Sequence, residues 1–531
     1  MTRERGALGN HAPVFVRHAW IAPLVFFSIF LLYPLLVLIR TAISADTLTA
    51  LVNSGPWSIA LLSTGQSLAS VGLSLIIGIP IAGVLARYQF KGRALVLALM
   101  TVPFVLPTVV VALAFKSILG ELLAPGLILV ILAHAYINVA VVVRIVGAQW
   151  SALDPRHINV AQTLGANPFR VFRTLTLPNL KASILSSACI VFVFSFTSLG
   201  VVVILGDGSS TRTLEQSILR QTSVLLDFPG ALASALIQLV IVTGALILAA
   251  KMRGATITLT HTHRTKVRGM RRSAWVYSIV ILSALIVLTP LAGLVIGSFT
   301  STQGMNFSSW VGVINAQDRF AGLGSPRAAV ALTISLALIT ALIASAIGGL
   351  AAIAVMGRRT FIAAIALIPL GLSAATIGLG TLLAFGRPPI DLRSSGFLIP
   401  IAHALVAIPL VVAVASPALR TADSRRFFVA SSLGASPARA WWTAYGTLLR
   451  TVMIAAGGLA GAVSLGEFGA ASFLARADSP TVPVQIAKLL ARPGDQAYTT
   501  AAVLSTILVV MTLALMLFID RFSAQGRITV S

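Results

Sequence analysis

Residues 154–181 read DPRHINVAQTLGANPFRVFRTLTLPNLK and separate two long apolar runs. Asp154 followed by Pro155 predicts a helix start, because the carboxylate can accept hydrogen bonds from free N–H groups and proline suits the first turn. Gly165 predicts the end of that helix, since glycine readily adopts the left-handed conformation. Asn167-Pro168 repeats the start signal. The segment, which we call the first elbow, therefore predicts a helix, a glycine turn and a second helix.

The second helix of the first elbow is predicted to be amphipathic. Phe169, Phe172 and Leu175 fall on one face, and Arg170 and Arg173 fall on another. Such a helix suits the boundary between cytoplasm and bilayer. An ordinary amphipathic surface loop is the plainer interpretation of this segment taken alone.

A second copy of the pattern occurs at residues 423–449, which read DSRRFFVASSLGASPARAWWTAYGTLL. Asp423, the run Leu433-Gly434-Ala435 and Pro437 repeat features of the first elbow, all at an offset of 269 residues. Features that keep their register at so large an offset favour a duplicated element over chance. We call this segment the second elbow.

Composition places the chain among polytopic membrane proteins. Of its 531 residues 57% are hydrophobic and 10% are charged, more apolar surface than a soluble core absorbs. The formal net charge of +24 would suggest nucleic acid in a soluble protein. The positive charges lie where membrane topology would place them, so no nucleic-acid partner is predicted.

The same inventory argues against an enzyme. Cys189 is the single cysteine, so an intramolecular disulfide or a cysteine-based metal site cannot form. The chain contains no Gly-Lys pair and hence no P-loop to hold nucleotide phosphates. We predict no catalytic residues, no metal and no cofactor, and ATP hydrolysis, if any, in another subunit.

An all-α fold of about twelve transmembrane helices is predicted from runs long enough to cross a bilayer. The runs lie near residues 20–40, 66–86, 94–114, 127–149, 183–205, 229–250, 275–298, 328–355, 361–385, 397–419, 452–475 and 499–519. With the amino terminus in the cytoplasm, 27 of the 38 Lys and Arg residues fall inside, as the positive-inside rule requires. Both termini are then cytoplasmic.

The chain divides into two similar halves, predicted as residues 1–260 and 261–531. His134 matches His403, and Ser198 matches Ser464, at offsets of 269 and 266. Six spans per half make the repeat parallel, with its axis along the membrane normal, where a substrate pathway is expected. The basic joint 251–272 includes His261 and His263, which we interpret as solvated linker residues.

Glu467 is the one acidic residue placed within a span, and a carboxylate at that depth favours a cavity or a partner. One interpretation is a residue of the translocation pathway or its gate, together with Ser198 and Ser464. The other is a carboxylate near the outer helix end that reaches water or Arg476. For His134 and His403 we predict hydrogen-bonded packing between helices rather than titration.

The two elbows resemble the cytoplasmic loop of permeases of binding-protein-dependent ABC importers. That loop has the form EAA, three residues, Gly, nine residues and I-x-LP. Asn159-Val160-Ala161, Gly165 and Leu175-Thr176-Leu177-Pro178 fall at its spacings, although the initial Glu and the middle Ala are absent. The second elbow departs further, with Phe428 at the Glu position and Gly446-Thr447 at the Leu-Pro position.

The resemblance implies a coupling role for particular residues and names the partners. The residues at the motif positions are Ala161, Gly165, Pro178, Ala430 and Gly434. The implied partners are two copies of a cytoplasmic ATPase subunit, a solute-binding protein on the outer side and the lipid bilayer, with the chain in the inner membrane.

The resemblance extends along the whole chain to fused two-half permeases of type I fold in the thiamine and ferric-iron branch. Residues 205–221 and 227–238 resemble thiamine permeases, whereas residues 464–490 look equally like ferric-iron permeases. Thiamine is the predicted substrate and ferric iron the alternative. An ion-coupled secondary transporter is the rival from another class, with a membrane sensor or channel as a third possibility.

Overall fold

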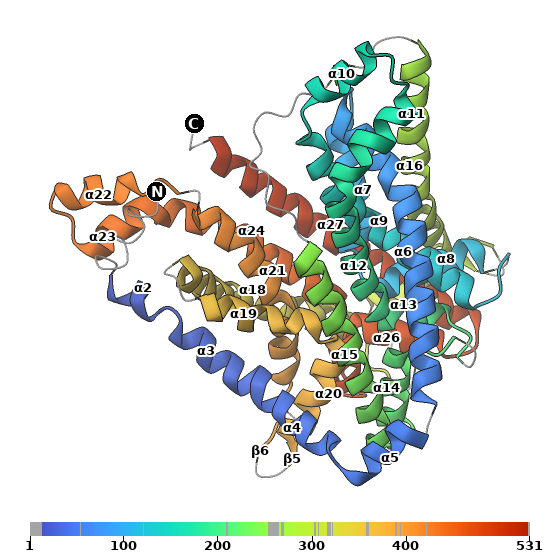
Figure 1. Cartoon of the computed structure of the whole chain (residues 1–531). Coiled ribbons are helices and arrows are strands. Elements are labelled where there is room, and N and C mark those ends of the chain that lie inside the picture. Colours follow the sequence, from blue (N-terminus) through green and yellow to red (C-terminus); the bar gives the residue numbers. More distant parts are fainter. Residues whose placement is uncertain are drawn as a thin grey trace. The chain divides into compact units, whose positions relative to one another are not determined.

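The computed structural model of the chain is almost entirely helical, as the sequence predicts (Figure 1). Within the described residues, ten helices are long and apolar enough to cross a membrane, and two bent helix pairs raise the total to twelve. The predicted all-α membrane fold is confirmed. The structure describes residues 13–53, 55–120, 122–208, 211–252, 265–266, 270–301, 304–305, 307–315, 320, 322–356, 360–387, 390–392, 395–420 and 422–528.

Two compact units make up the chain, and neither is continuous in sequence. One consists of residues 1–48, 310–492 and 507–531, and the other of residues 49–309 and 493–506. We call them the 310–492 unit and the 49–309 unit. Three helices cross their sequence limits: α5 (Ala45–Asn53), α17 (Ser308–Ile314) and α27 (Asp495–Ile528).

The 49–309 unit contains the first elbow. Its elements are α6 (Pro56–Arg87), β1 (Tyr88–Gln89), α7 (Arg93–Val105), α8 (Thr108–Leu119), α9 (Leu127–Ser151), α10 (Pro155–Thr163), α11 (Pro168–Val171), the π-helical turn η2 (Phe172–Thr176), α12 (Leu177–Phe196), α13 (Leu199–Leu205), α14 (Leu214–Ser223), α15 (Phe228–Met252), β2 (Thr265–Lys266), α16 (Met270–Gly297), β3 (Thr300–Ser301) and β4 (Gly304–Met305). Strands β1 and β2 pair in parallel, and β3 and β4 pair antiparallel.

The 310–492 unit contains the second elbow. Its elements are α2 (Val14–His18), α3 (Ile21–Phe27), the π-helical turn η1 (Ser28–Leu32), α4 (Tyr33–Ala42), α18 (Pro326–Met356), α19 (Thr360–Leu367), the 3-10 turn η3 (Ile368–Gly371), α20 (Ala374–Phe385), β5 (Gly386–Arg387), β6 (Ile390–Asp391), α21 (Leu398–Arg420), α22 (Arg425–Ser432), α23 (Pro437–Trp441), the π-helical turn η4 (Trp442–Gly446), α24 (Thr447–Gly466), α25 (Gly469–Leu474) and α26 (Val482–Leu490). Strands β5 and β6 form an antiparallel hairpin.

The third span of each half is bent rather than continuous, which corrects the runs predicted at 94–114 and 361–385. Helices α7 and α8 meet at 102°, and the segment ending in η3 meets α20 at 101°. In the first half Leu106 precedes Pro107 and is extended, because a residue before proline avoids the helical conformation. In the second half Ser373 starts a new helix by accepting from the N–H of Thr376 at 2.9 Å.

The fifth spans are also broken, near the end predicted to face outward. Helix α12 ends at Phe196 and α13 starts at Leu199, while α24 ends at Gly466 and α25 starts at Gly469. The runs predicted at 183–205 and 452–475 are therefore each two helices. In the second half the break falls at Glu467, which is extended.

Each unit takes its first span from the other half of the sequence. In the 49–309 unit, α16 packs on α7 and α8, and the hydroxyl of Tyr136 donates to the carbonyl of Val287 at 2.9 Å. In the 310–492 unit, α4 packs on α20, where Gly380 lies close to the carbonyl of Pro34. Packing thus exchanges the first spans between the halves.

The boundary predicted between residues 260 and 261 lies outside the described residues, as do His261 and His263. Most of the basic joint 251–272 falls there too. The division into sequence halves stays a prediction, beside the compact units that packing defines.

Candidate functional site

The first elbow has the helix, glycine turn and second helix that its sequence predicts. The side chain of Asp154 accepts from the N–H of Arg156 at 2.8 Å and caps α10. Gly165 has a φ of +82°, and beyond it the N–H of Ala166 donates to the carbonyl of Ala161 at 3.0 Å. That bond closes the helix end and is the reason a left-handed residue is needed at the turn.

The second elbow repeats this backbone although its sequence has diverged. Asp423 accepts from the N–H of Arg425 at 3.0 Å. Gly434 has a φ of +83°, and the N–H of Ala435 donates to the carbonyl of Ala430 at 3.0 Å. The two turns are the same structure, so the missing EAA residues have not changed the local fold.

A π-helical turn joins each elbow to the span that follows it, η2 to α12 and η4 to α24. The wider turn changes which side chains share a face. Phe169 is 71% exposed, whereas Val171 is buried at 3%. The predicted face of Phe169, Phe172 and Leu175 is therefore wrong, because its spacing assumed 3.6 residues per turn throughout.

The predicted coupling residues lie on or beside the two elbows. Gly165 and Gly434 are exposed at the turns, and Ala161 and Ala430 are partly exposed, with their carbonyls closing the turns. Pro178 is exposed in the first turn of α12, where a missing N–H costs nothing.

Each elbow also exposes two apolar side chains that sequence reasoning missed. Val160 and Leu164 are 57% and 81% exposed on the first elbow. Val429 and Leu433, at the same offset of 269 residues, are 58% and 83% exposed on the second. Apolar side chains exposed at matching places in two copies indicate a surface that a partner covers. Their shared register was the signal available in the sequence.

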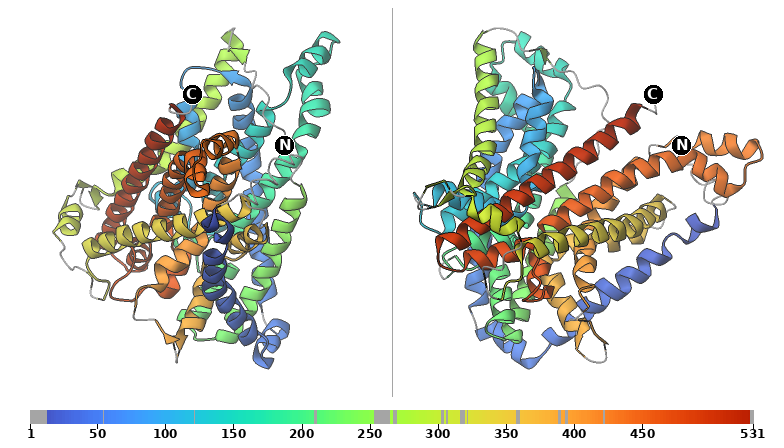
Figure 2. Two further views of the ribbon diagram at one scale, coloured as in Figure 1. Left: turned by 90° about the vertical axis from the view of Figure 1, so that its left-hand side faces the viewer. Right: turned by 180° about the vertical axis from the view of Figure 1, so that it is seen from behind.

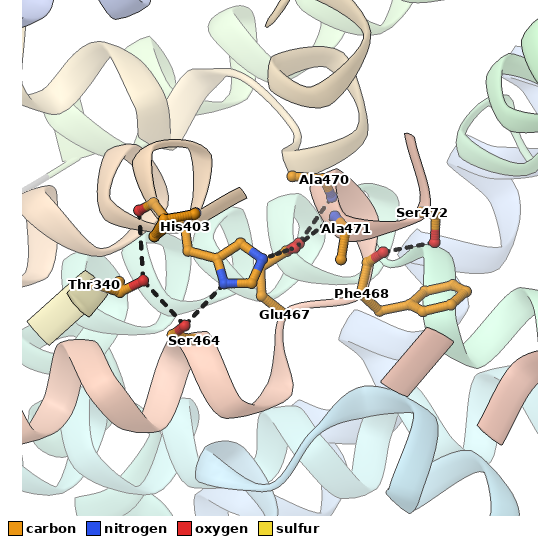
Figure 3. A network of polar contacts seen from close by, with 9 residues as sticks. Thr340, His403, Ser464, Glu467, Phe468, Ala470, Ala471 and Ser472 are labelled. Atoms are coloured by element: carbon orange, nitrogen blue, oxygen red, sulfur yellow. Dashed lines mark hydrogen bonds and ion pairs between the residues drawn. The ribbon is translucent and has the colours of Figure 1, made fainter. Parts of the chain in front are cut away.

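A buried polar network surrounds Glu467 in the 310–492 unit (Figure 3). Its carboxylate accepts from the N–H groups of Ala470 and Ala471, each at 3.0 Å, and so caps α25. Nε2 of His403 lies 3.1 Å from the same carboxylate. Glu467 is only 7% exposed, and Arg476 instead pairs with Asp478 at 3.5 Å. The carboxylate therefore bonds within its own unit rather than to Arg476.

The network continues through Ser464 into α18. Nδ1 of His403 lies 2.8 Å from the hydroxyl oxygen of Ser464, which donates to Thr340 at 3.2 Å. Figure 3 shows these side chains bridging α21, α24 and α18. His403 is packed and hydrogen-bonded, as predicted.

The first half has no such acid, because Val201 stands where the second half has Glu467. There Nδ1 of His134 lies 3.1 Å from Oε1 of Gln66, which confirms hydrogen-bonded packing for this histidine as well. Ser198 is buried at 8%. Among the described residues its hydroxyl has no hydrogen-bond partner, unlike that of Ser464.

Comparison with known proteins gives the family. Residues 74–254, which contain the first elbow and Ser198, match the binding-protein-dependent transport system inner membrane component. The chain is 28% identical over 494 residues to the thiamine transport system permease protein ThiP of Brucella abortus, covering 89% of this chain and 88% of the relative.

Two further relatives extend this comparison. The chain is 31% identical over 186 residues to the sulfate transport system permease protein CysT of Salmonella typhimurium, covering 33% of this chain and 67% of the relative. It is 27% identical over 215 residues to ThiP of Escherichia coli, covering 38% and 40%. The chain therefore belongs to the family of binding-protein-dependent transport system inner membrane components and is an ABC importer permease.

Proposed function

We propose that this permease imports thiamine and is driven by two copies of a separate cytoplasmic ATPase subunit. The observation that carries the coupling part is the pair of matching elbows. Each has the same glycine turn and the same two exposed apolar side chains, Val160 and Leu164 on one and Val429 and Leu433 on the other. Two equivalent surfaces suit two copies of one partner.

The coupling residues of this proposal are Ala161, Gly165, Pro178, Ala430 and Gly434. The glycine turns hold the exposed leucines at a fixed angle to the spans that follow them. ATP-driven closure of the ATPase pair would displace both elbows, and the spans would then change the side to which the pathway opens. The elbows are cytoplasmic in this proposal, as are both chain termini.

Thiamine is proposed because a thiamine permease is similar over 89% of this chain. Thiamine carries a permanent positive charge on its thiazolium ring, so an acidic residue in a span would complement it. Glu467 is the proposed pathway acid, with Ser464 and Ser198 as polar positions at matching places in the two halves. A solute-binding protein on the outer side would deliver the substrate.

The test is reconstitution of the whole complex, with its ATPase and binding protein, in lipid vesicles. We expect thiamine to raise ATP turnover and to accumulate inside only when ATP is present. ATP-independent uptake, or turnover unchanged by thiamine, would contradict the proposal.

Ferric iron is the alternative substrate, favoured only by the resemblance of residues 464–490 to ferric-iron permeases. The same vesicles supplied with chelated ferric iron separate the two. Stimulation by ferric iron and not by thiamine would move the assignment to the iron branch.

A further inference from the structure

The first span carries a line of aromatic side chains that contacts the rest of the 310–492 unit at several levels. Helices α2, α3 and α4 with turn η1 form one candidate span, Val14–Ala42. Figure 2 shows this span running from the second elbow toward the β5–β6 hairpin of the same unit. Its rings at the two ends have defined partners.

At one end, α2 packs on the second elbow. The ring of Phe15 lies edge-on to Trp441, with centroids 5.1 Å apart, and is stacked on Trp442 at 6.2 Å. Val16 is buried in the same cluster as Phe427 and Trp441. Trp441 is only 2% exposed. The second elbow is therefore supported by the amino-terminal helix, through contacts at distances typical of attractive aromatic pairs.

At the other end, the first span packs on the broken third span. Phe30 and Tyr33 lie 5.9 Å and 5.7 Å from the ring of Phe385. Phe385 is the last residue of α20, next to the β5–β6 hairpin, and is 5% exposed. Between the ends, Trp20 lies 6.1 Å from Phe361 of α19. The first span thus touches both arms of the bent third span.

The first elbow is supported differently. Phe172, which matches Trp441 at the offset of 269, lies 6.0 Å from Trp150 of α9. Trp150 matches Leu419 in the second half. The large ring that supports the first elbow thus comes from the fourth span of its own half. In the second elbow the leucine leaves room that Phe15 and the tryptophans fill.

We propose that the first span is a strut that transmits movement of the second elbow to the bent third span, with Phe15 and Phe385 as positioning residues at its ends. Packed rings transmit displacement because close-packed interiors deform little. The strut makes the two elbows unequal, since only the second moves together with an amino-terminal span. This inference rests on the proposed coupling function, although its first test needs no substrate.

That test follows the β5–β6 hairpin with a water-soluble maleimide in the complete complex with the ATPase. The reporter is Ser395→Cys, an exposed position just beyond the hairpin, in a Cys189→Ala background. We expect the labelling rate to differ between the ATP-bound and the nucleotide-free complex. Phe15→Ala should abolish that difference, and Phe15→Trp should keep it.

The matched control is Val14→Ala, on the same helix but 71% exposed, which should leave the nucleotide-dependent difference intact. The inference is overturned if the unmodified strut shows no nucleotide-dependent labelling, or if Phe15→Ala leaves the difference unchanged.

A double-mutant comparison gives a second readout, the amount of thiamine transported per ATP hydrolysed. We expect Phe15→Ala and Phe385→Ala each to lower it by about threefold, the effect that one aromatic pair supports. Combined, they should lower it no further than the stronger single change, because both break one strut. Multiplying effects would contradict the strut, whereas absence of thiamine transport by the parent complex would contradict only the proposed substrate.

Discussion

Nε2 of His403 lies 3.1 Å from the carboxylate of Glu467, at the point where the fifth span of the second half is broken. The pair joins α21 to the junction of α24 and α25, and both residues are almost inaccessible to solvent. A buried acid that also caps a helix has little freedom to be replaced.

Glu467→Ala should therefore destabilise the 310–492 unit. It leaves the N–H groups of Ala470 and Ala471 and a ring nitrogen of His403 without their acceptor, at a cost of about 3 kcal/mol. We expect a clear fall in the thermal denaturation midpoint of the purified protein. Glu467→Gln retains an acceptor of the same shape and should lose less. Equal losses from both substitutions would show that charge, rather than hydrogen bonding, stabilises the junction.

The glycine turns should tolerate a side chain sterically but not conformationally. An added Cβ at Gly165 or Gly434 would meet no atom within 4 Å, yet φ is +82° and +83°. Alanine there costs about 1–2 kcal/mol and should open the elbow. We expect Gly165→Ala or Gly434→Ala to reduce the amount of ATPase subunit recovered with the purified permease.

The control is Gly72→Ala, which also has open space but lies within helix α6. It should retain full ATPase recovery, because alanine favours a helix over glycine. Full recovery with both elbow variants would mean that the turn conformation is not needed for docking.

The exposed leucines should dominate ATPase docking. Leu164→Asp or Leu433→Asp places a charge where an apolar contact is expected, and about tenfold weaker ATPase binding corresponds to the loss of one such anchor. Thermal stability should not change, because both side chains are more than 80% exposed. Leu122→Asp, at a position 78% exposed away from the elbows, is the control. Binding unaffected by either elbow variant would refute docking at these side chains.

A strained backbone at Leu226 offers a stabilising substitution. Leu226 has a φ of +54°, whereas Gly494, its match at an offset of 268 residues, occupies the equivalent turn with a φ of +110°. Leu226→Gly should remove the left-handed strain and raise the free energy of unfolding by up to about 1 kcal/mol. Leu225→Gly, without positive φ to relieve, should lower it. Denaturation midpoints measured in detergent compare the two, and a lower midpoint for Leu226→Gly would mean that the leucine contacts outweigh the strain.

Family membership decides between the function classes that the residues left open. An ABC importer permease replaces the ion-coupled secondary transporter and the membrane sensor or channel as the class of this protein. The single intramembrane acid, Glu467, was weak support for ion coupling from the start, since its partner is His403.

The span pattern and the elbows could be predicted because both are local. Long apolar runs determine helices in lipid whatever surrounds them, and Asp-Pro and glycine signals determine the elbow turns by capping. The bends at Pro107 and Ser373 had local signals too, although apolar runs obscured them. The π-helical turns had none, so the exposure of Phe169 could not be predicted from helical spacing.

The sequence by itself thus determined the membrane class, the internal repeat and the two glycine elbows, since hydropathy and capping act within a few residues. Only the tertiary structure decided that each first span packs with the other half's helices, that Glu467 bonds His403, and that Phe15 supports the second elbow. These contacts join residues 64 to more than 400 positions apart, and no local rule selects among the many apolar or polar partners that a chain of this length offers.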